Sequence, residues 1–182
     1  IDRLLAANFH NRTAFGASLP VMYKVLLIGF LVCHLTMADE QFLADSVLVD
    51  KSERKLYLLR EGIKHRAYSI ALGPRPRGHK LHAGDERAPE GRYILDFKTE
   101  KSDFYKAIHI SYPNEQDIKR ALDIGAAPGG SIMIHGMPNN TTLPPELIQM
   151  FNWTDGCIAV TNQDMDEIWS AIKPGTPIDI RP

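Results

Sequence analysis

Residues 131–136 read Ser-Ile-Met-Ile-His-Gly, and residues 153–160 read Trp-Thr-Asp-Gly-Cys-Ile-Ala-Val. The apolar run before His135 predicts a short buried strand that ends at an imidazole. In the second stretch Cys157 follows a glycine and precedes three apolar residues. A thiol and an imidazole, each next to a glycine, are the parts of a cysteine nucleophile with a general base. These two stretches therefore predict both a buried strand of the fold and a candidate catalytic pair.

The cysteine content sets Cys157 apart. The chain holds 2 cysteines, and the other one, Cys33, lies in the apolar part of an apparent signal peptide. Small exported domains usually hold their cysteines in disulfides, so an unpaired thiol there favours a chemical role. The structural alternatives are that Cys157 is a small core residue and that His135 only ends its strand.

The segment 22–38 has the three parts of a signal peptide. A lysine near its start precedes a short apolar run, and Thr36-Met37-Ala38 places small residues where a signal peptidase cuts. The apolar run is shorter than the about 20 residues that a membrane-spanning helix needs. We expect cleavage after Ala38, with an uncleaved anchor or a buried helix as the alternatives.

The signal-peptide prediction also determines how we interpret the residues on either side of it. The chain begins at Ile1, and we interpret residues 1–21 as sequence translated upstream of a start at Met22. Residues 39–45 are expected to be a linker, and residues 46–182 a single catalytic domain. The expected location is the periplasm or cell envelope, with membrane contact only through the signal segment.

Composition excludes some partners. Charged residues make up 24% of the chain and apolar residues 44%, which is typical of a globular protein. The formal net charge is −1 and no run of lysine or arginine occurs, so we expect no nucleic acid partner. No second cysteine or histidine lies at ligand spacing from Cys157, so we predict no metal site.

Hydrophobic periodicity predicts a chain that is mainly β with a few helices. Short apolar runs broken by turn residues predict strands at 47–49, 55–59, 67–73, 93–97, 107–112, 131–134 and 176–180. The glycine- and proline-rich residues 73–91 predict a loop. Helices are expected at 114–124, at 144–151 and after Thr161. We expect Asn114 to cap the first helix, and Ile118, Ala121 and Leu122 to share one face of it.

Two further segments extend the pattern around Cys157. Residues 84–93 read Gly-Asp-Glu-Arg-Ala-Pro-Glu-Gly-Arg-Tyr, and residues 109–114 read His-Ile-Ser-Tyr-Pro-Asn. Together with 131–136 and 153–160, in this order, they resemble the motifs of the L,D-transpeptidase (YkuD-type) catalytic domain family. The resemblance covers about residues 46–181. It implies a β-sandwich of mixed sheets with the site on its rim, and no metal, nucleotide or organic cofactor.

The resemblance also implies a role for each matching residue. Cys157 would be the nucleophile, His135 its base, and the Gly136 carbonyl the group that orients the imidazole. The thiolate would attack the third, diamino-acid residue of a peptidoglycan tetrapeptide stem, release D-alanine and form a thioester. An amine of a second stem or of an envelope protein would then resolve that thioester.

The chain departs from the commoner family pattern at two positions. Asp155 stands where that pattern has a histidine, and Ala159 where it has an arginine that could bind a carboxylate. Substrate anchoring is then expected from Arg75, Arg87 and Arg92, with Tyr93 next to them; the alternative is that these arginines are solvated surface charges.

The residues just before the nucleophile are expected to support it. Gly156 would allow a tight turn and offer its amide to an oxyanion, with Thr154 and Asp155 holding the loop. We expect Asp155 to point away, because a carboxylate that faces the thiolate would raise its pKa.

Three functions are compatible with these residues. The first is the acyltransferase described above. The second is an L,D-specific hydrolase or amidase that cuts peptidoglycan–peptide links with the same Cys157 and His135, water replacing the amine. The third is an inactive module that binds the cell wall, against which the intact pair of Cys157 and His135 argues.

Overall fold

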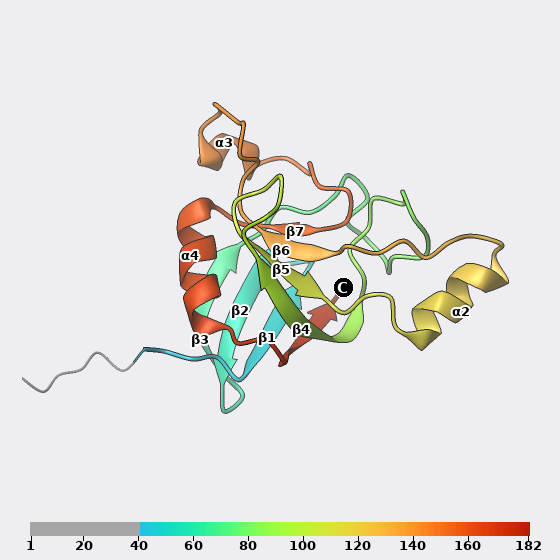
Figure 1. Ribbon diagram of the computed structural model, residues 1–182, viewed down its shortest axis with the longest axis horizontal. Coiled ribbons are helices and arrows are strands. Elements are labelled where there is room, and N and C mark those ends of the chain that lie inside the picture. Colours follow the sequence, from blue (N-terminus) through green and yellow to red (C-terminus); the bar gives the residue numbers. More distant parts are fainter. Residues whose placement is uncertain (1–40) are drawn as a thin grey trace, which may run out of the picture. The chain divides into compact units, whose positions relative to one another are not determined.

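The computed structural model describes residues 41–182 (Figure 1). The predicted signal peptide, its cleavage site and Cys33 lie outside these residues. The elements of the described part are β1 (Ser46–Asp50), β2 (Lys55–Arg60), β3 (Ile63–Ser69), β4 (Gly91–Thr99), β5 (Ala107–Ile110), α2 (Glu115–Asp123), β6 (Met133–His135), α3 (Pro145–Ile148), β7 (Ile158–Ala159), α4 (Asn162–Ala171) and β8 (Thr176–Arg181). None of the helices between residues 41 and 182 is long and apolar enough to cross a bilayer.

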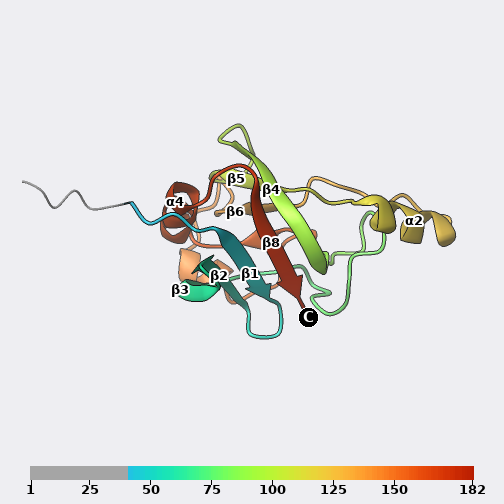
Figure 2. The same ribbon diagram turned by 90° about the horizontal axis from the view of Figure 1, so that it is seen from below.

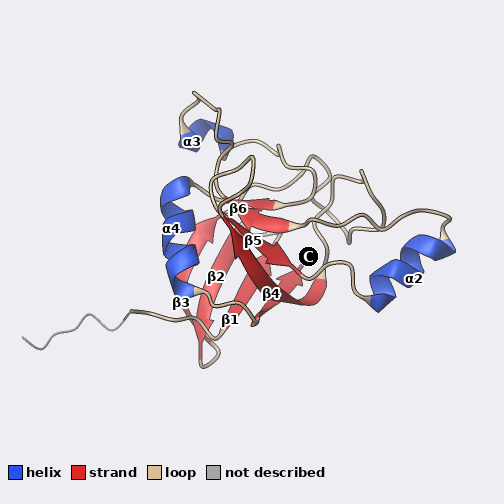
Figure 3. Ribbon diagram, in the orientation of Figure 1, coloured by secondary structure: helices blue, strands red, loops and turns tan. Residues whose placement is uncertain are grey.

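The strands form one mixed sheet. Their order is β3-β2-β1-β8-β4-β5-β6-β7, so the last strand is inserted between β1 and β4 (Figure 2). The pairs β1–β8 and β6–β7 are parallel, and the other pairs are antiparallel. This confirms the prediction of a mainly β fold with mixed strand directions and few helices, which lie at the periphery of the strands (Figure 3).

The sheet curls until its two ends meet. Ala71, just beyond β3, exchanges two backbone hydrogen bonds with Ala159 of β7, at 2.8 and 3.0 Å. Strands at the ends of a sheet otherwise leave unpaired backbone groups, and this bridge satisfies part of them. Its consequence for function is that the short strand β7 is held from both sides.

Apolar side chains that alternate along the strands fill the interior of the curl. In β2 Leu56 and Leu58 are fully buried on either side of the partly exposed Tyr57, as a strand with one buried face requires. Helix α4, which begins after Thr161 as predicted, packs on this core with Met165 and Ile168 fully buried. Its N-cap Thr161 accepts a hydrogen bond from the Asp164 amide.

Helix α2 buries a different set of residues from the one that the sequence predicts. Asn114 caps it as expected, but of the predicted apolar face only Ala121 is buried, because Ile118 is 41% and Leu122 67% exposed. The residues that the helix buries are Asp117 and Ala121. The buried Asp117 carboxylate accepts hydrogen bonds from Arg120 of the same helix and from Tyr93 of β4, and the bond from Tyr93 holds this face of the helix inside. The helix extends away from the sheet (Figure 1).

The predicted loop between β3 and β4 is held by buried ion pairs. Lys51 of the β1–β2 turn pairs with Glu90 at 2.7 Å, and Lys80 pairs with Asp85 at 2.9 Å. Both lysine side chains are almost fully buried. The loop therefore has a fixed course past the end of β7 although it contains hardly any regular structure.

Candidate active site

The parallel pairing of β6 with β7 brings His135 and Cys157 to one face of the sheet. In that pair Ile134 lies opposite Ile158 and His135 opposite Ala159. Side chains alternate along a strand, so Cys157, two residues before Ala159, points to the same side as His135.

One hydrogen bond determines the tautomer of His135. Its Nδ1 lies 2.8 Å from the carbonyl oxygen of Gly136. A carbonyl only accepts, so the proton is on Nδ1 and the lone pair is on Nε2. Burial lowers the pKa of His135 to about 4, so the imidazole is neutral at neutral pH. It can therefore accept a proton.

Two aromatic rings fix the plane of the imidazole. Phe104 stacks on it with ring centroids 4.1 Å apart, and Trp153 meets it edge-on at 5.6 Å. These contacts, with the hydrogen bond to Gly136, leave the ring little freedom to rotate.

Gly136 cannot be replaced without displacing this arrangement. A Cβ there would lie 2.6 Å from the Asn162 side-chain oxygen and 2.9 Å from the Tyr105 carbonyl. Asn162 uses the same oxygen to accept from the Met137 amide. The backbone at Gly136 is thus packed against both Asn162 and Tyr105.

Cys157 is a free, partly buried thiol. Its Sγ donates to the Ser131 carbonyl at 3.6 Å. Burial raises the pKa of the thiol, the Met133 amide and the Lys80 charge act against that rise, and the Asp155 charge adds to it. The resting pair is therefore a neutral thiol and a neutral imidazole, which suits removal of the thiol proton during attack.

The turn before Cys157 is fixed by Thr154 and Gly156. The Thr154 hydroxyl donates to the Cys157 carbonyl at 2.7 Å. Gly156 has a φ of +113°, and a Cβ there would lie 2.6 Å from the Arg87 carbonyl oxygen. Asp155 is exposed at the tip of the turn. The loop is therefore supported by Thr154 and by the backbone of Arg87.

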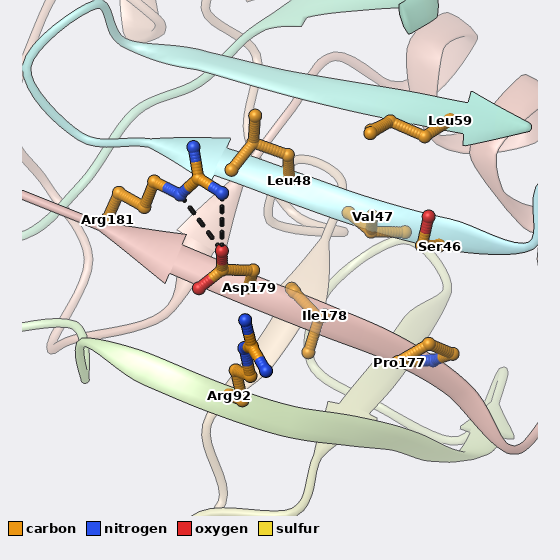
Figure 4. A pocket seen from close by; sticks show the side chains of 9 residues that line it. All are labelled: Ser46, Val47, Leu48, Leu59, Arg92, Pro177, Ile178, Asp179 and Arg181. Atoms are coloured by element: carbon orange, nitrogen blue, oxygen red, sulfur yellow. Dashed lines mark hydrogen bonds and ion pairs between the residues drawn. The ribbon is translucent and has the colours of Figure 1, made fainter. Parts of the chain in front are cut away.

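The four residues expected to bind substrate lie in different places. The backbone of Arg87 lies against Gly156, in the turn before Cys157. Arg75 is exposed, and its Nε lies 3.8 Å from a carboxylate oxygen of Glu86. Arg92 lines a pocket over β1, β8 and β4 that contains neither Cys157 nor His135, and it extends beside Asp179 (Figure 4). Tyr93 is buried, and its hydroxyl donates to Asp117. Of the four, Arg87 is the one that the structure brings to the turn before Cys157.

Some residues of the site carry no signal in the sequence. Phe104 lies in the segment between β4 and β5, outside the motifs, and Lys80 looks like a solvated charge in a polar loop. Trp153 lies in the motif, but its contact with His135 needs the fold. Within residues 41–182 no group of three or more His, Cys, Asp or Glu side chains is placed to share a metal ion.

Comparisons with known proteins identify the family of the chain. The model of the family described as L,D-transpeptidase catalytic domain (YkuD) matches residues 44–180. The protein named "Putative L,D-transpeptidase YafK" of Escherichia coli strain K12 is 30% identical over 169 residues, which cover 88% of this chain and 57% of YafK. The chain therefore belongs to the L,D-transpeptidase catalytic domain family. It spans a little over half the length of this relative.

Solved structures of similar fold include the following three. The helical cell shape determining protein Pgp2 of Campylobacter jejuni is 26% identical with a TM-score of 0.56, over 74% of this chain and 46% of Pgp2. Bd1075 of Bdellovibrio bacteriovorus is 25% identical with a TM-score of 0.53, over 76% of this chain and 48% of Bd1075. An L,D-transpeptidase of Xylanimonas cellulosilytica, 15% identical with a TM-score of 0.50 over 78% of this chain and 62% of its own, shares the fold.

Proposed function

We propose that this chain is a cysteine acyltransferase of the cell envelope that forms a thioester between Cys157 and a peptidoglycan tetrapeptide stem. The observation that supports it most is the β6–β7 register, which puts Cys157 on the same face as a histidine whose Nε2 is free to accept a proton. The family to which the chain belongs acts on peptidoglycan peptides.

In the first half of the reaction, Nε2 of His135 takes the thiol proton while Sγ of Cys157 bonds to the carbonyl carbon of the third stem residue. The imidazolium that forms is stabilised by the Gly136 carbonyl, which accepts from Nδ1. The C–N bond to D-alanine then breaks, and His135 returns the proton to the leaving amine. The thioester remains on Cys157.

The second half of the reaction reverses these roles. An amine attacks the thioester carbonyl, His135 accepts a proton from it, and Cys157 leaves as the thiol. In both halves the negative oxygen needs hydrogen-bond donors, and we assign the Gly156 amide to this task. The acceptor is an amine of a second stem or of an envelope protein.

Hydrolysis of the same thioester is the second candidate, and Ala159 favours it. The side chain of Ala159 is fully buried, and its backbone is bridged to Ala71. An arginine, which could hold a carboxylate of the substrate in the commoner pattern, has no room there. With that anchor absent, water replaces the amine as the second reactant in this candidate.

Product analysis separates the two candidates. The purified chain is incubated with disaccharide tetrapeptides, and the products are identified by mass. Crosslinked dimers with released D-alanine support the acyltransferase, and D-alanine without dimers supports the hydrolase. If neither product forms and Cys157 does not react with a carbapenem, the chain is a cell-wall-binding module instead.

We also propose that the chain is exported before it acts. The support is the signal-peptide pattern of residues 22–38 and a family whose substrate lies in the envelope. N-terminal sequencing of the protein from cells tests this. Asp39 as the first residue is the expected result, and an intact start at Met22 would contradict it.

A further inference from the structure

Lys80 and Asp85 form an ion pair inside the loop that precedes β4. Their side chains are 3% and 5% exposed, and Nζ of Lys80 donates to Oδ1 of Asp85 at 2.9 Å and to the His82 carbonyl at 3.1 Å. Burying two charges is costly unless the geometry is good and their other hydrogen bonds are made. The burial of this ion pair therefore needs a structural or functional reason.

The Asp85 carboxylate accepts hydrogen bonds from the backbone around it. Oδ2 accepts from the amides of Leu81 and His82, and Oδ1 accepts from the amide of Arg87 at 3.2 Å. Burial acts to raise the pKa of Asp85, but Lys80 and these amides hold it below its ordinary value. The Asp85 carboxylate is thus ionised, and its hydrogen bonds fix the backbone from residue 80 to residue 87.

That backbone supports the nucleophile on two sides. On one side the Arg87 carbonyl lies against Gly156, the residue before Cys157. On the other side the Ala83 amide donates to Ala127 at 2.8 Å, and Ala83 packs against Gly129. The segment that includes Gly129 continues to Ser131, whose carbonyl accepts from the Cys157 thiol.

The charge of Lys80 also acts on the thiol. Two charged groups act on the Cys157 thiol: Asp155, whose charge disfavours the thiolate, and Lys80, whose charge favours it. His135, on the same face of the sheet, is neutral and adds no charge. Lys80 uses two of its three N–H donors within the loop. A buried cation near a thiol is a known way to increase its thiolate fraction.

We propose that Lys80, held by Asp85, is a positioning residue for Cys157, which fixes both sides of the nucleophile's turn and keeps a positive charge near the thiolate. The proposal rests on the proposed function only in that Cys157 is the nucleophile. It concerns the ionisation of the thiol, which can be measured without turnover.

The test is the pH profile of alkylation of Cys157 by iodoacetamide in the full chain. Mass analysis of the peptide that contains Cys157 separates it from Cys33. Lys80→Met alone leaves a buried carboxylate without its partner, so the main variant is Lys80→Met with Asp85→Asn, checked for folding by circular dichroism. We expect its midpoint to rise by about one pH unit, and the rate at pH 7.5 to fall about tenfold. Lys80→Arg, which keeps the charge, should stay within about threefold of the wild-type rate.

The chain offers a matched control in its other buried pair. Lys51 and Glu90 lie 2.7 Å apart, and Lys51 also donates to the Gly78 carbonyl of the same loop. Lys51→Met with Glu90→Gln should lower thermal stability and leave the alkylation profile unchanged. The proposal is overturned if the folded Lys80/Asp85 variant keeps the wild-type profile, or if the Lys51/Glu90 variant shifts it equally. Absence of turnover on stem peptides would count against the proposed function but would not alter these rates.

Discussion

At the scale of single residues, His135 combines burial with one fixed hydrogen bond. The residue is 2% exposed, and its Nδ1 bonds to the Gly136 carbonyl. Burial lowers the pKa and keeps the imidazole neutral although the bond to Gly136 acts to raise it, and that bond leaves the lone pair on Nε2. A histidine placed in this way is ready to act as a base, and it also makes the stability of the fold depend on pH.

The first prediction is this pH dependence. An unfolded histidine has a pKa of about 6.5 and folded His135 one of about 4, so the unfolded chain binds more protons between these values. The free energy of unfolding should therefore fall as pH falls from about 6.5 to about 4, by roughly 3 kcal/mol from this group. Urea unfolding at pH 7 and pH 4.5 measures it. His135→Gln should lose this part of the slope, and an equal slope in both proteins would contradict the prediction.

The second prediction concerns Gly156. An alanine there meets an unfavourable φ, at a cost of about 1–3 kcal/mol, and also a clash with the Arg87 carbonyl, which adds about 1–3 kcal/mol. Gly175→Ala is the control, because its φ is +96° but nothing lies within 4 Å of a Cβ. Thermal unfolding should show the larger loss for Gly156→Ala, together with slower alkylation of Cys157. Equal losses at both positions would mean that the contact with Arg87 does not matter.

At the scale of elements, helix α2 is fixed by polar bonds and not by its apolar residues. The third prediction follows: Leu122→Ala should change the free energy of unfolding by less than about 0.5 kcal/mol, because Leu122 is 67% exposed. Leu95→Ala in β4, where the side chain is fully buried, should cost about 2–5 kcal/mol. Chemical denaturation of both variants tests this, and a large loss at Leu122 would show that its side chain is covered in solution.

The same helix shows what the sequence can and cannot predict about elements. Alternating apolar residues predicted the strands, and Asn114 and Thr161 predicted where two helices begin, because these signals are local. The inward face of α2 depends on Tyr93, which is distant in the sequence and meets Asp117 only in the fold. Lys80 and Asp85 were missed for the same reason, since a charged loop residue usually faces water.

At the scale of the whole molecule, the arrangement of strands makes the site. His135 and Cys157 are 22 residues apart in the sequence, and the parallel pairing of β6 and β7 brings them to one face. The sequence predicted both residues through their glycine neighbours and the family resemblance. It could not predict the bridge from Ala71 to Ala159, because the local pattern of a strand does not determine its partners.

The curl of the sheet also explains why the predicted arginines do not form one group. Arg92 lies on β4 in a pocket with β1 and β8, while Cys157 lies next to β7 at the end of the strand order. A residue that lies in or near a motif in the sequence, such as Arg92, therefore need not lie near Cys157 in the structure. Contacts between loops, such as that of Arg87 with Gly156, bring residues to the site instead.

The most direct test of the whole account is the mass of the intact protein after brief incubation with a peptidoglycan tetrapeptide stem. We predict an adduct of the stem without its terminal D-alanine, attached at Cys157, and its complete loss in Cys157→Ala. Release of D-alanine that continues in Cys157→Ala, or a stable adduct on any other residue, would contradict the assignment of Cys157 as the nucleophile.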